Sequence, residues 1–185
     1  MPQAWYRDES DENLFEPHTT DPPEFLTCEQ VLEKTGVRLS KVENCDDEEV
    51  QAKLRQDGSF MSHDWLEISK EVLQDEYEEK LKKYYAEHLH KDAEIRLIVA
   101  GGGYFEVRDF NDKWIRLRVT KGTLINLPGG MYHRLTLDSD NYIKMLRLFS
   151  EVPAWEAVNR PEGDTHPVRK EYLATLPTDA PVAEA

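Results

Sequence analysis

The stretch "EIRLIVAGGGYFEVRDFNDKWIRLRV", Glu94–Val119, decides the fold because its residues alternate in character. Apolar Phe105 and Val107 alternate with charged Glu106 and Arg108, which is the period of two that a β-strand requires. The three glycines inside the stretch predict a turn between two strands. Six strand-like segments lie between residues 86 and 150: "EIRLIVA", "GYFEVRDF", "KWIRLRV", "TLINLP", "MYHRLTL" and "NYIKMLRLF". Short strands without intervening helices predict a mainly β chain, folded as an antiparallel β-barrel or jelly roll.

Helices are expected before this barrel, in the N-terminal half. Residues 27–36 contain a capping box, with Thr27 at the N-cap and Gln30 three positions later. Residues 46–58 begin with acids and end in glycine, which are further helix signals. A longer helix is expected from about residue 70 to about residue 85, where apolar residues recur near helical spacing.

These features divide the chain into three regions. Residues 1–26 form an acidic N-terminal segment with a short strand at "AWYR". Residues 27–160 form the barrel domain with its preceding helices, and the barrel core spans 86–150. Residues 161–185 form a tail that is expected to be partly disordered, since it ends in "LPTDAPVAEA".

Length and charge limit the possible partners. The chain has 185 residues, 39% of them hydrophobic, and a formal net charge of -14. This length suits one domain with a single core. The negative charge argues against nucleic acid and membrane as partners, because both favour a basic surface. No apolar run is long enough to span a bilayer, and no targeting signal is recognisable, so we expect a soluble cytoplasmic protein, with the nucleus as a further location. Cys28 and Cys45 are expected to be free thiols.

The candidate site begins at two histidines one residue apart. Residues of equal parity share one face of a strand, so an extended segment would present His88, His90 and Glu94 together. In a helix the two histidines would lie about 200° apart. A helix could still pair His90 with Glu94, but it would exclude His88. A strand is therefore the only regular arrangement that uses all three side chains.

The same parity places Arg96 and Ile98 on the inner face beside Glu94. The odd-numbered residues of this strand are apolar, so both of its faces are expected to be covered. An inward arginine needs an anionic partner, which could be Glu94 or a bound acidic substrate. In the last strand Arg147 shares parity with Met145, and we expect it to be a second inward cation.

A third histidine, His133, lies in "LPGGMYHRLTL" and shares a face with apolar residues. Such a histidine alone is more often a core residue than a ligand, but the His-x-His-x-x-x-Glu pattern on an earlier strand favours a metal site. Three imidazoles and one carboxylate suit Fe(II), Ni(II), Mn(II), Co(II) or Zn(II). On an octahedral ion they leave two positions for a bidentate oxygen substrate. The pattern therefore predicts Lewis-acid or dioxygen chemistry at an open site.

Two motifs resemble those of the cupins. "HLHKDAEIRLIVAGG" fits the first, with its two histidines, glutamate and glycine at the family's spacing, and "GTLINLPGGMYH" fits the second. Leu137 stands where the second motif usually has an asparagine. More closely, the chain resembles the eukaryotic branch of the acireductone dioxygenase family. This resemblance extends from "QAWYRD" to "NRP" at residues 159–161 and includes the flanking strands.

The resemblance implies a cupin barrel and a reaction. Members oxidise 1,2-dihydroxy-3-keto-5-methylthiopentene, the acireductone of methionine salvage, with dioxygen. With Fe(II) the products are 4-methylthio-2-oxobutanoate and formate, and with Ni(II) they are methylthiopropionate, formate and carbon monoxide. It also implies one Fe(II) per chain, with Ni(II) as the alternative metal. The implied ligands are His88, His90, Glu94 and His133, and Arg96 is the implied catalytic residue that stabilises the enediolate.

Candidate substrate-binding residues are Arg96, Ile98, Leu135 and Arg147. Leu135 stands where the family often has an aromatic residue, and it keeps an apolar wall for the methylthio tail. Two alternatives stay open: a metal-binding cupin that acts as an interaction or regulatory module without turnover, and a cupin isomerase that acts on a sugar without dioxygen. We expect a monomer, because no alternating strand carries an obviously exposed apolar face.

Overall fold

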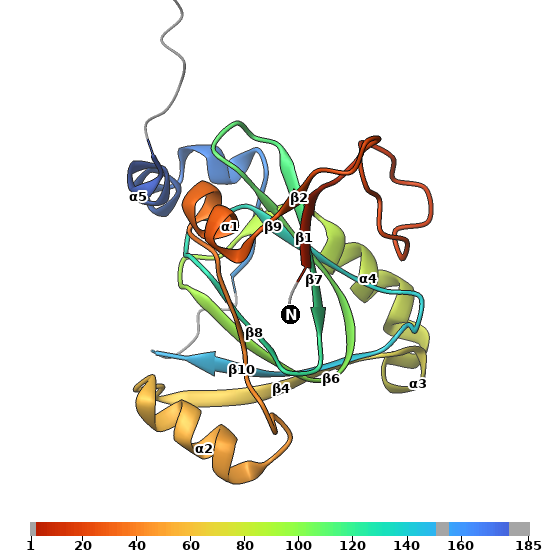
Figure 1. Cartoon of the computed structure of the whole chain (residues 1–185), viewed down its shortest axis with the longest axis vertical. Helices are drawn as coiled ribbons and strands as arrows, with labels where there is room; N and C mark the ends of the chain where they lie inside the picture. The colour runs from red at the N-terminus through yellow and green to blue at the C-terminus, as the bar shows by residue number, and fades with distance from the viewer. Residues whose placement is uncertain (1–2, 151–155, 178–185) are drawn as a thin grey trace, which may run out of the picture.

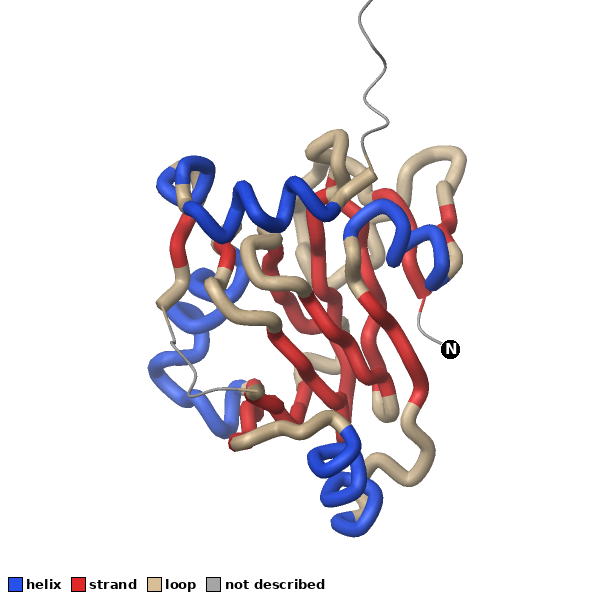
Figure 2. Tube along the Cα trace, turned by 90° about the vertical axis from the view of Figure 1, so that its left-hand side faces the viewer, coloured by secondary structure: helices blue, strands red, loops and turns tan. Residues whose placement is uncertain are grey.

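One strand, β6 (Glu94–Arg108), belongs to both sheets of an antiparallel barrel and organises the fold. The computed structural model describes residues 3–150 and 156–177. Strands fill the centre of the molecule and helices lie around them, as Figures 1 and 2 show. Helices α1 and α5 lie at one end of the barrel and α2 at the other (Figure 1). The expected mainly β barrel, with several helices in the N-terminal half, is confirmed.

The first sheet is built around the second half of β6, residues 102–108, which lies between β7 and β9. Its strand order is β11–β5–β9–β6–β7–β1–β2, and neighbouring strands are antiparallel. The bounds of the other six strands are Val158–Asn159 for β11, His88–Leu89 for β5, His133–Leu137 for β9, Trp114–Thr120 for β7, Gln3–Tyr6 for β1 and Phe25–Leu26 for β2.

The second sheet is built around the first half of β6, residues 94–101, which lies between β8 and β10. Its order is β3–β8–β6–β10–β4, again antiparallel throughout. The bounds of the other four strands are Arg38–Lys41 for β3, Thr123–Leu127 for β8, Ile143–Phe149 for β10 and Ser62–Ile68 for β4.

The glycine run at residues 101–103 does not form a turn, so that prediction is wrong. These residues lie within β6, which continues through them as it passes from one sheet to the other. Gly101 has φ +67°, and a methyl group there would overlap the carbonyl oxygen of Tyr142. A methyl group on Gly103 would lie 2.5 Å from the Thr136 carbonyl oxygen. The glycines therefore bend a continuous strand at a corner of the barrel, where neighbouring backbone leaves no room for side chains.

Hydrophobic clusters cover both faces of the first half of β6, as predicted. Ile98 belongs to the large inner core between the two sheets. Ile95, Leu97 and Val99 belong to a second cluster on the outer face, against which Leu54 of α2 packs. Burial of each such side chain stabilises the fold by about 1.5–3 kcal/mol. The strand is therefore fixed from both sides.

The two short predicted helices are confirmed as α1 (Cys28–Thr35) and α2 (Glu48–Asp57). The Thr27 hydroxyl accepts from the Gln30 amide at 3.2 Å, and the Gln30 side chain accepts from the Thr27 amide at 2.9 Å. This reciprocal pair is the capping box expected from the spacing. At α2 the Asp47 carboxylate is the N-cap and accepts a hydrogen bond from the Glu49 backbone amide.

The predicted continuous helix over residues 70–85 is wrong, because it is interrupted. It consists of α3 (Lys70–Leu73), a single 3₁₀ turn η1 (Gln74–Glu76) and α4 (Tyr77–Tyr85). Gln74 has φ +48°, although no glycine or proline marks the break. Tyr77 is buried and its hydroxyl donates to the Asn141 side chain on the barrel. The start of α4 therefore coincides with a tertiary contact, which the spacing of apolar residues within the helix cannot predict.

The segment after β11 contains structure that the sequence did not predict. It forms a 3₁₀ turn η2 (Glu162–Thr165) and a helix α5 (Pro167–Thr175). Arg169 and Tyr172 of α5 are buried, and Arg169 Nη1 donates to the Gly130 carbonyl at 3.2 Å. Most of the end that was expected to be disordered, residues 178–185, lies outside the described residues.

The expectation for the two cysteines agrees with the structure. Cys28 and Cys45 are free thiols. Among residues 3–150 and 156–177, no helix has the length and apolar character needed to cross a membrane.

We expect Gly101→Ala to lower the free energy of unfolding by at least about 2 kcal/mol, because a side chain at positive φ would also meet the Tyr142 carbonyl. Equilibrium unfolding in urea measures this. The control is Arg118→Ala, at an exposed position of β7, which should change stability by less than about 0.5 kcal/mol. Wild-type stability in Gly101→Ala would contradict the account of the bend.

Candidate metal centre

The four candidate ligands converge between β5, β6 and β9. His88 lies on β5, His90 follows it, and Glu94 and His133 are the first residues of β6 and β9. The ligand nitrogens of the three histidines all lie within 4.8 Å of one another. Glu94 Oε1 is 3.0 Å from His90 Nε2, and Glu94 Oε2 is 3.6 Å from His133 Nε2. The structure thus brings together the four residues that the motifs single out.

The first three of these residues do not share one continuous strand, which corrects the parity argument. Strand β5 ends at Leu89, and the chain bends at residues 91–92 before β6 begins. Pairing between strands brings the side chains together instead, because His88 is the register partner of His133. The Gly130 amide also donates to the His90 carbonyl at 2.8 Å, which joins the segment after β5 to the segment before β9.

Backbone carbonyls set the orientation of each imidazole. The Nδ1 atom of His88 lies 2.6 Å from the Ala86 carbonyl oxygen. The corresponding distances are 3.0 Å from His90 Nδ1 to the Glu156 carbonyl oxygen and 3.1 Å from His133 Nδ1 to the Met131 carbonyl oxygen. A carbonyl can only accept, so each Nδ1 carries the hydrogen. In the neutral ring this leaves the Nε2 lone pair free, which is the tautomer that binds a metal through Nε2.

Burial controls the charges at this site. Arg96 Nη2 lies 2.9 Å from Glu94 Oε2. Burial by itself would raise the pKa of Glu94, but Arg96 and then His133 lower that pKa to about 2. Burial lowers the pKa of His133 to about 3, although Glu94 opposes the change, and burial also lowers the pKa of His88. At neutral pH an ionised carboxylate therefore faces neutral rings of His88 and His133.

These groups fit a divalent ion. Glu94 Oε1 lies 3.0 Å from His90 Nε2, and two atoms that both carry lone pairs repel at this distance unless a proton or a metal ion lies between them. Arg96 compensates the charge of Glu94, but it does not satisfy the Nε2 atoms. Three nitrogens and one carboxylate are a donor set that suits Fe(II), Ni(II) and related ions.

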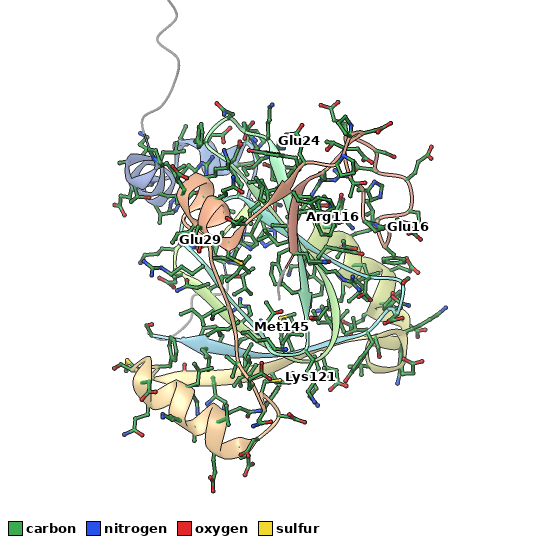
Figure 3. The ribbon with its side chains drawn as sticks, in the orientation of Figure 1. Glu16, Glu24, Glu29, Arg116, Lys121 and Met145 are labelled. Atoms are coloured by element: carbon green, nitrogen blue, oxygen red, sulfur yellow. The ribbon has the colours of Figure 1, made fainter. Side chains whose placement is uncertain are left out.

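A cavity of about 470 Å³ opens beside the four side chains. Its apolar lining includes Leu66, Tyr84, Phe105, Leu135 and Met145. Met145, labelled in Figure 3, lies in the interior of the barrel. The polar lining of the cavity, apart from the candidate ligands, includes Lys83, Arg96, Arg147 and Asn159. The cavity can therefore receive a small molecule with an anionic head and an apolar tail.

The candidate substrate-binding residues occupy different places. Arg96, Leu135 and Arg147 line the cavity. Arg147 is held by Asp64 through two contacts, Nε to Oδ1 and Nη2 to Oδ2, each 2.6 Å long. Ile98 is fully buried in the core and is not part of the lining, so it offers the cavity no surface.

The sequence candidates did not include the apolar lining residues Leu66, Phe105 and Met145. Three residues that contribute polar groups near the site were also missed. Lys83 and Asn159 line the cavity, and Glu156 holds His90. Lys83 belongs to a charged helix face without a distinctive pattern. Glu156 acts through its main-chain oxygen, which leaves no side-chain signature. Of these three, Asn159 alone had a signal, since it lies in the "NRP" segment of the family resemblance.

The barrel and this candidate centre define the chain as a cupin with three histidines and one glutamate at a cavity. The profile of the ARD/ARD' family matches residues 3–157, and the chain belongs to this family. The family resemblance inferred from the motifs is therefore confirmed.

Relatives and a solved structure agree with this assignment. The chain is 48% identical to the acireductone dioxygenase of Branchiostoma floridae over 176 residues, which cover 95% of this chain and 98% of the relative. It is 44% identical to that of Gallus gallus over 183 residues, which cover 97% and 99%. A structure of acireductone dioxygenase from Bacillus anthracis, with a cadmium ion in its active centre, has a TM-score of 0.65 at 23% identity and covers 85% of this chain and 98% of its own. This last likeness supports the fold.

The depressed pKa of His133 predicts a pH-dependent stability of the metal-free protein. Between about pH 6.5, the ordinary value, and about pH 3, the unfolded chain binds a proton on His133 that the folded chain does not. Stability should fall as pH falls through this window, by up to about 1.4 kcal/mol per pH unit from this group. Urea unfolding of metal-free protein from pH 4 to 7 measures it.

Removing the titrating group tests the assignment. The slope of the free energy of unfolding against pH should be smaller in His133→Gln, by the equivalent of about one bound proton. His63→Gln, at an exposed position, should keep the wild-type slope. Equal slopes in wild type and His133→Gln would contradict the burial of a neutral imidazole.

Proposed function

We propose that this chain is an acireductone dioxygenase of methionine salvage that uses one Fe(II) per chain. It oxidises 1,2-dihydroxy-3-keto-5-methylthiopentene with dioxygen to 4-methylthio-2-oxobutanoate and formate. With Ni(II) in its place, the products are methylthiopropionate, formate and carbon monoxide. The observation that carries the proposal is the set of three oriented histidines and Glu94, with Arg96 beside it, at the edge of one cavity. Family membership and the names of the relatives support the substrate.

The proposed ligands are His88, His90, Glu94 and His133. An ion held by these four side chains would supply Lewis-acid chemistry, which favours the deprotonated enediol and its reaction with dioxygen. The three backbone carbonyls keep the Nε2 atoms directed at the site before substrate arrives. This preorganisation avoids reorientation of the rings during the reaction.

The remaining lining residues bind the two ends of the substrate. Arg96 places a guanidinium beside Glu94, where it stabilises negative charge on the enediolate. Arg147, whose charge is paired with Asp64, is the register partner of Arg96 and adds a second fixed guanidinium beside it. Leu135 and Met145 provide the apolar surface for the methylthio tail. Together these contacts distinguish an acireductone from a small polar diol.

The proposed partners are the acireductone and dioxygen, without nucleic acid or membrane. A net charge of -14 supports this, because anionic polymers and surfaces would be repelled. We propose a monomer in the cytoplasm, with the nucleus as a further location. Light scattering after size-exclusion chromatography would contradict the monomer if it gave twice the mass of the chain.

His88→Ala should remove both metal binding and turnover. We expect wild-type protein loaded with Fe(II) to consume dioxygen on addition of acireductone, and His88→Ala to lose at least about 99% of this rate. Oxygen electrode traces, elemental analysis and product analysis measure the outcome. His63→Ala, at an exposed position, is the matched control and should behave as wild type.

The same assay separates the alternatives. A metal-binding interaction module would hold one metal per chain without consuming acireductone. A cupin isomerase would turn over its substrate equally well under nitrogen. Wild-type protein with no stoichiometric transition metal would overturn the proposal.

Arg96→Met should lower kcat by about 10²–10³-fold while the metal stays bound, because the enediolate loses a buried positive charge. Arg96→Lys keeps the charge and should retain more of the rate. Steady-state kinetics with metal analysis measures both, and Arg118→Met, at an exposed position, is the control. An unchanged kcat in Arg96→Met would exclude Arg96 from the chemistry.

A further inference from the structure

Strand β5, which carries His88, is unusually dependent on its surroundings. It contains only two residues, His88 and Leu89, and meets β9 through a single register pair, His88 with His133. Its other side pairs with β11, where Asn159 is the partner of His88. Two residues cannot fix a strand by their own ladder. The position of His88 therefore depends on contacts made by the neighbouring chain segment.

One arginine at the end of β11 provides such contacts. The Arg160 amide donates to the Glu87 carbonyl at 3.1 Å, which extends the pairing by one step beyond His88. Arg160 Nη1 donates to Glu87 Oε1 at 3.1 Å and to Asp112 Oδ1 at 2.9 Å. Arg108 holds the same Glu87 carboxylate through Nε at 3.0 Å and Nη2 at 3.1 Å. Glu87 is thus bound by two guanidinium groups and by its main chain.

These groups are partly shielded from water. The exposed fractions of the side chains are 18% for Glu87, 18% for Arg108 and 30% for Arg160. The guanidinium of Arg108 also lies over the Trp114 ring at 3.8 Å. A shielded network with a bidentate arginine holds its geometry better than an isolated surface pair.

Arg160 reaches the neighbours of all three histidines. It binds Glu87, the residue before His88. Its guanidinium lies 5.2 Å from the centre of the Tyr132 ring, and Tyr132 precedes His133. It ends the segment that begins at Glu156, whose carbonyl accepts from His90.

Neither Arg160 nor Glu87 lines the cavity. Glu87 precedes His88 in an extended segment, so its side chain points to the opposite face. These two residues can therefore influence the site only through the backbone that carries the histidines.

We infer that Arg160 is a positioning residue for the metal centre, which it acts on through its ion pair with Glu87 and its contact with Tyr132. The pair holds β5 against β11, so that His88 and His90 keep the separation from His133 that one ion requires. This inference rests on the proposed metal site. It adds to that site an ion pair that touches neither the metal nor the substrate.

Cobalt binding by the metal-free full chain tests this role, because Co(II) reports ligand geometry in its visible spectrum. We expect Arg160→Ala to weaken Co(II) binding about tenfold and to alter the spectrum, as loss of supporting contacts does at other metal sites. Arg160→Lys can still offer one charged donor to Glu87 and should recover part of both. Arg38→Ala, at an exposed position on β3 in the other sheet, is the control and should match wild type.

A second variant keeps the test decisive if Arg160→Ala fails to fold. Glu87→Gln preserves the shape of the side chain and removes its charge, and it should weaken Co(II) binding in the same direction. Wild-type affinity and spectrum in both variants, or in Glu87→Gln alone when Arg160→Ala does not fold, would overturn the inference, even if the melting temperature falls. Wild-type protein that binds no Co(II) would instead overturn the proposed metal site, and the inference with it.

Discussion

The continuous passage of β6 through both sheets is the constraint on which the site depends. Glu94 and Arg96 lie in the half that pairs with β8 and β10, whereas Phe105 lies in the half that pairs with β7 and β9. One backbone therefore sets the distance between the charged and the apolar lining of the cavity. A slip of one residue would turn Glu94 and Arg96 to the outer face. The bend at Gly101 and the clusters on both faces prevent this slip.

Charge balance inside the barrel favours an anionic ligand. Glu94 is paired with Arg96, and Asp64 with Arg147, so these four side chains add no net charge. A divalent ion among the imidazoles would leave at least two positive charges in excess, and Lys83 also lines the cavity. A deprotonated acireductone would offset this excess, whereas a neutral sugar would not. The cavity thus differs from a closed structural site, in which the protein ligands alone complete the coordination.

Much of the fold and the site could be predicted because both leave local signals. Alternation of apolar and polar residues marked the strands, and Thr27 with Gln30 marked a helix start. Motif spacing marked the four candidate ligands. The bend of β6, the break at Gln74 and the helix α5 could not be predicted, since each depends on contacts with distant backbone or side chains. The support of His90 by a carbonyl oxygen is invisible in sequence for the same reason.

The most direct test of the account is anaerobic titration of metal-free protein with Fe(II), followed by X-ray absorption spectroscopy of the one-to-one complex. The account predicts one tight site per chain, with three imidazoles and one carboxylate among its ligands. Binding of less than one ion per chain, or a spectrum with fewer than three imidazoles, would contradict it.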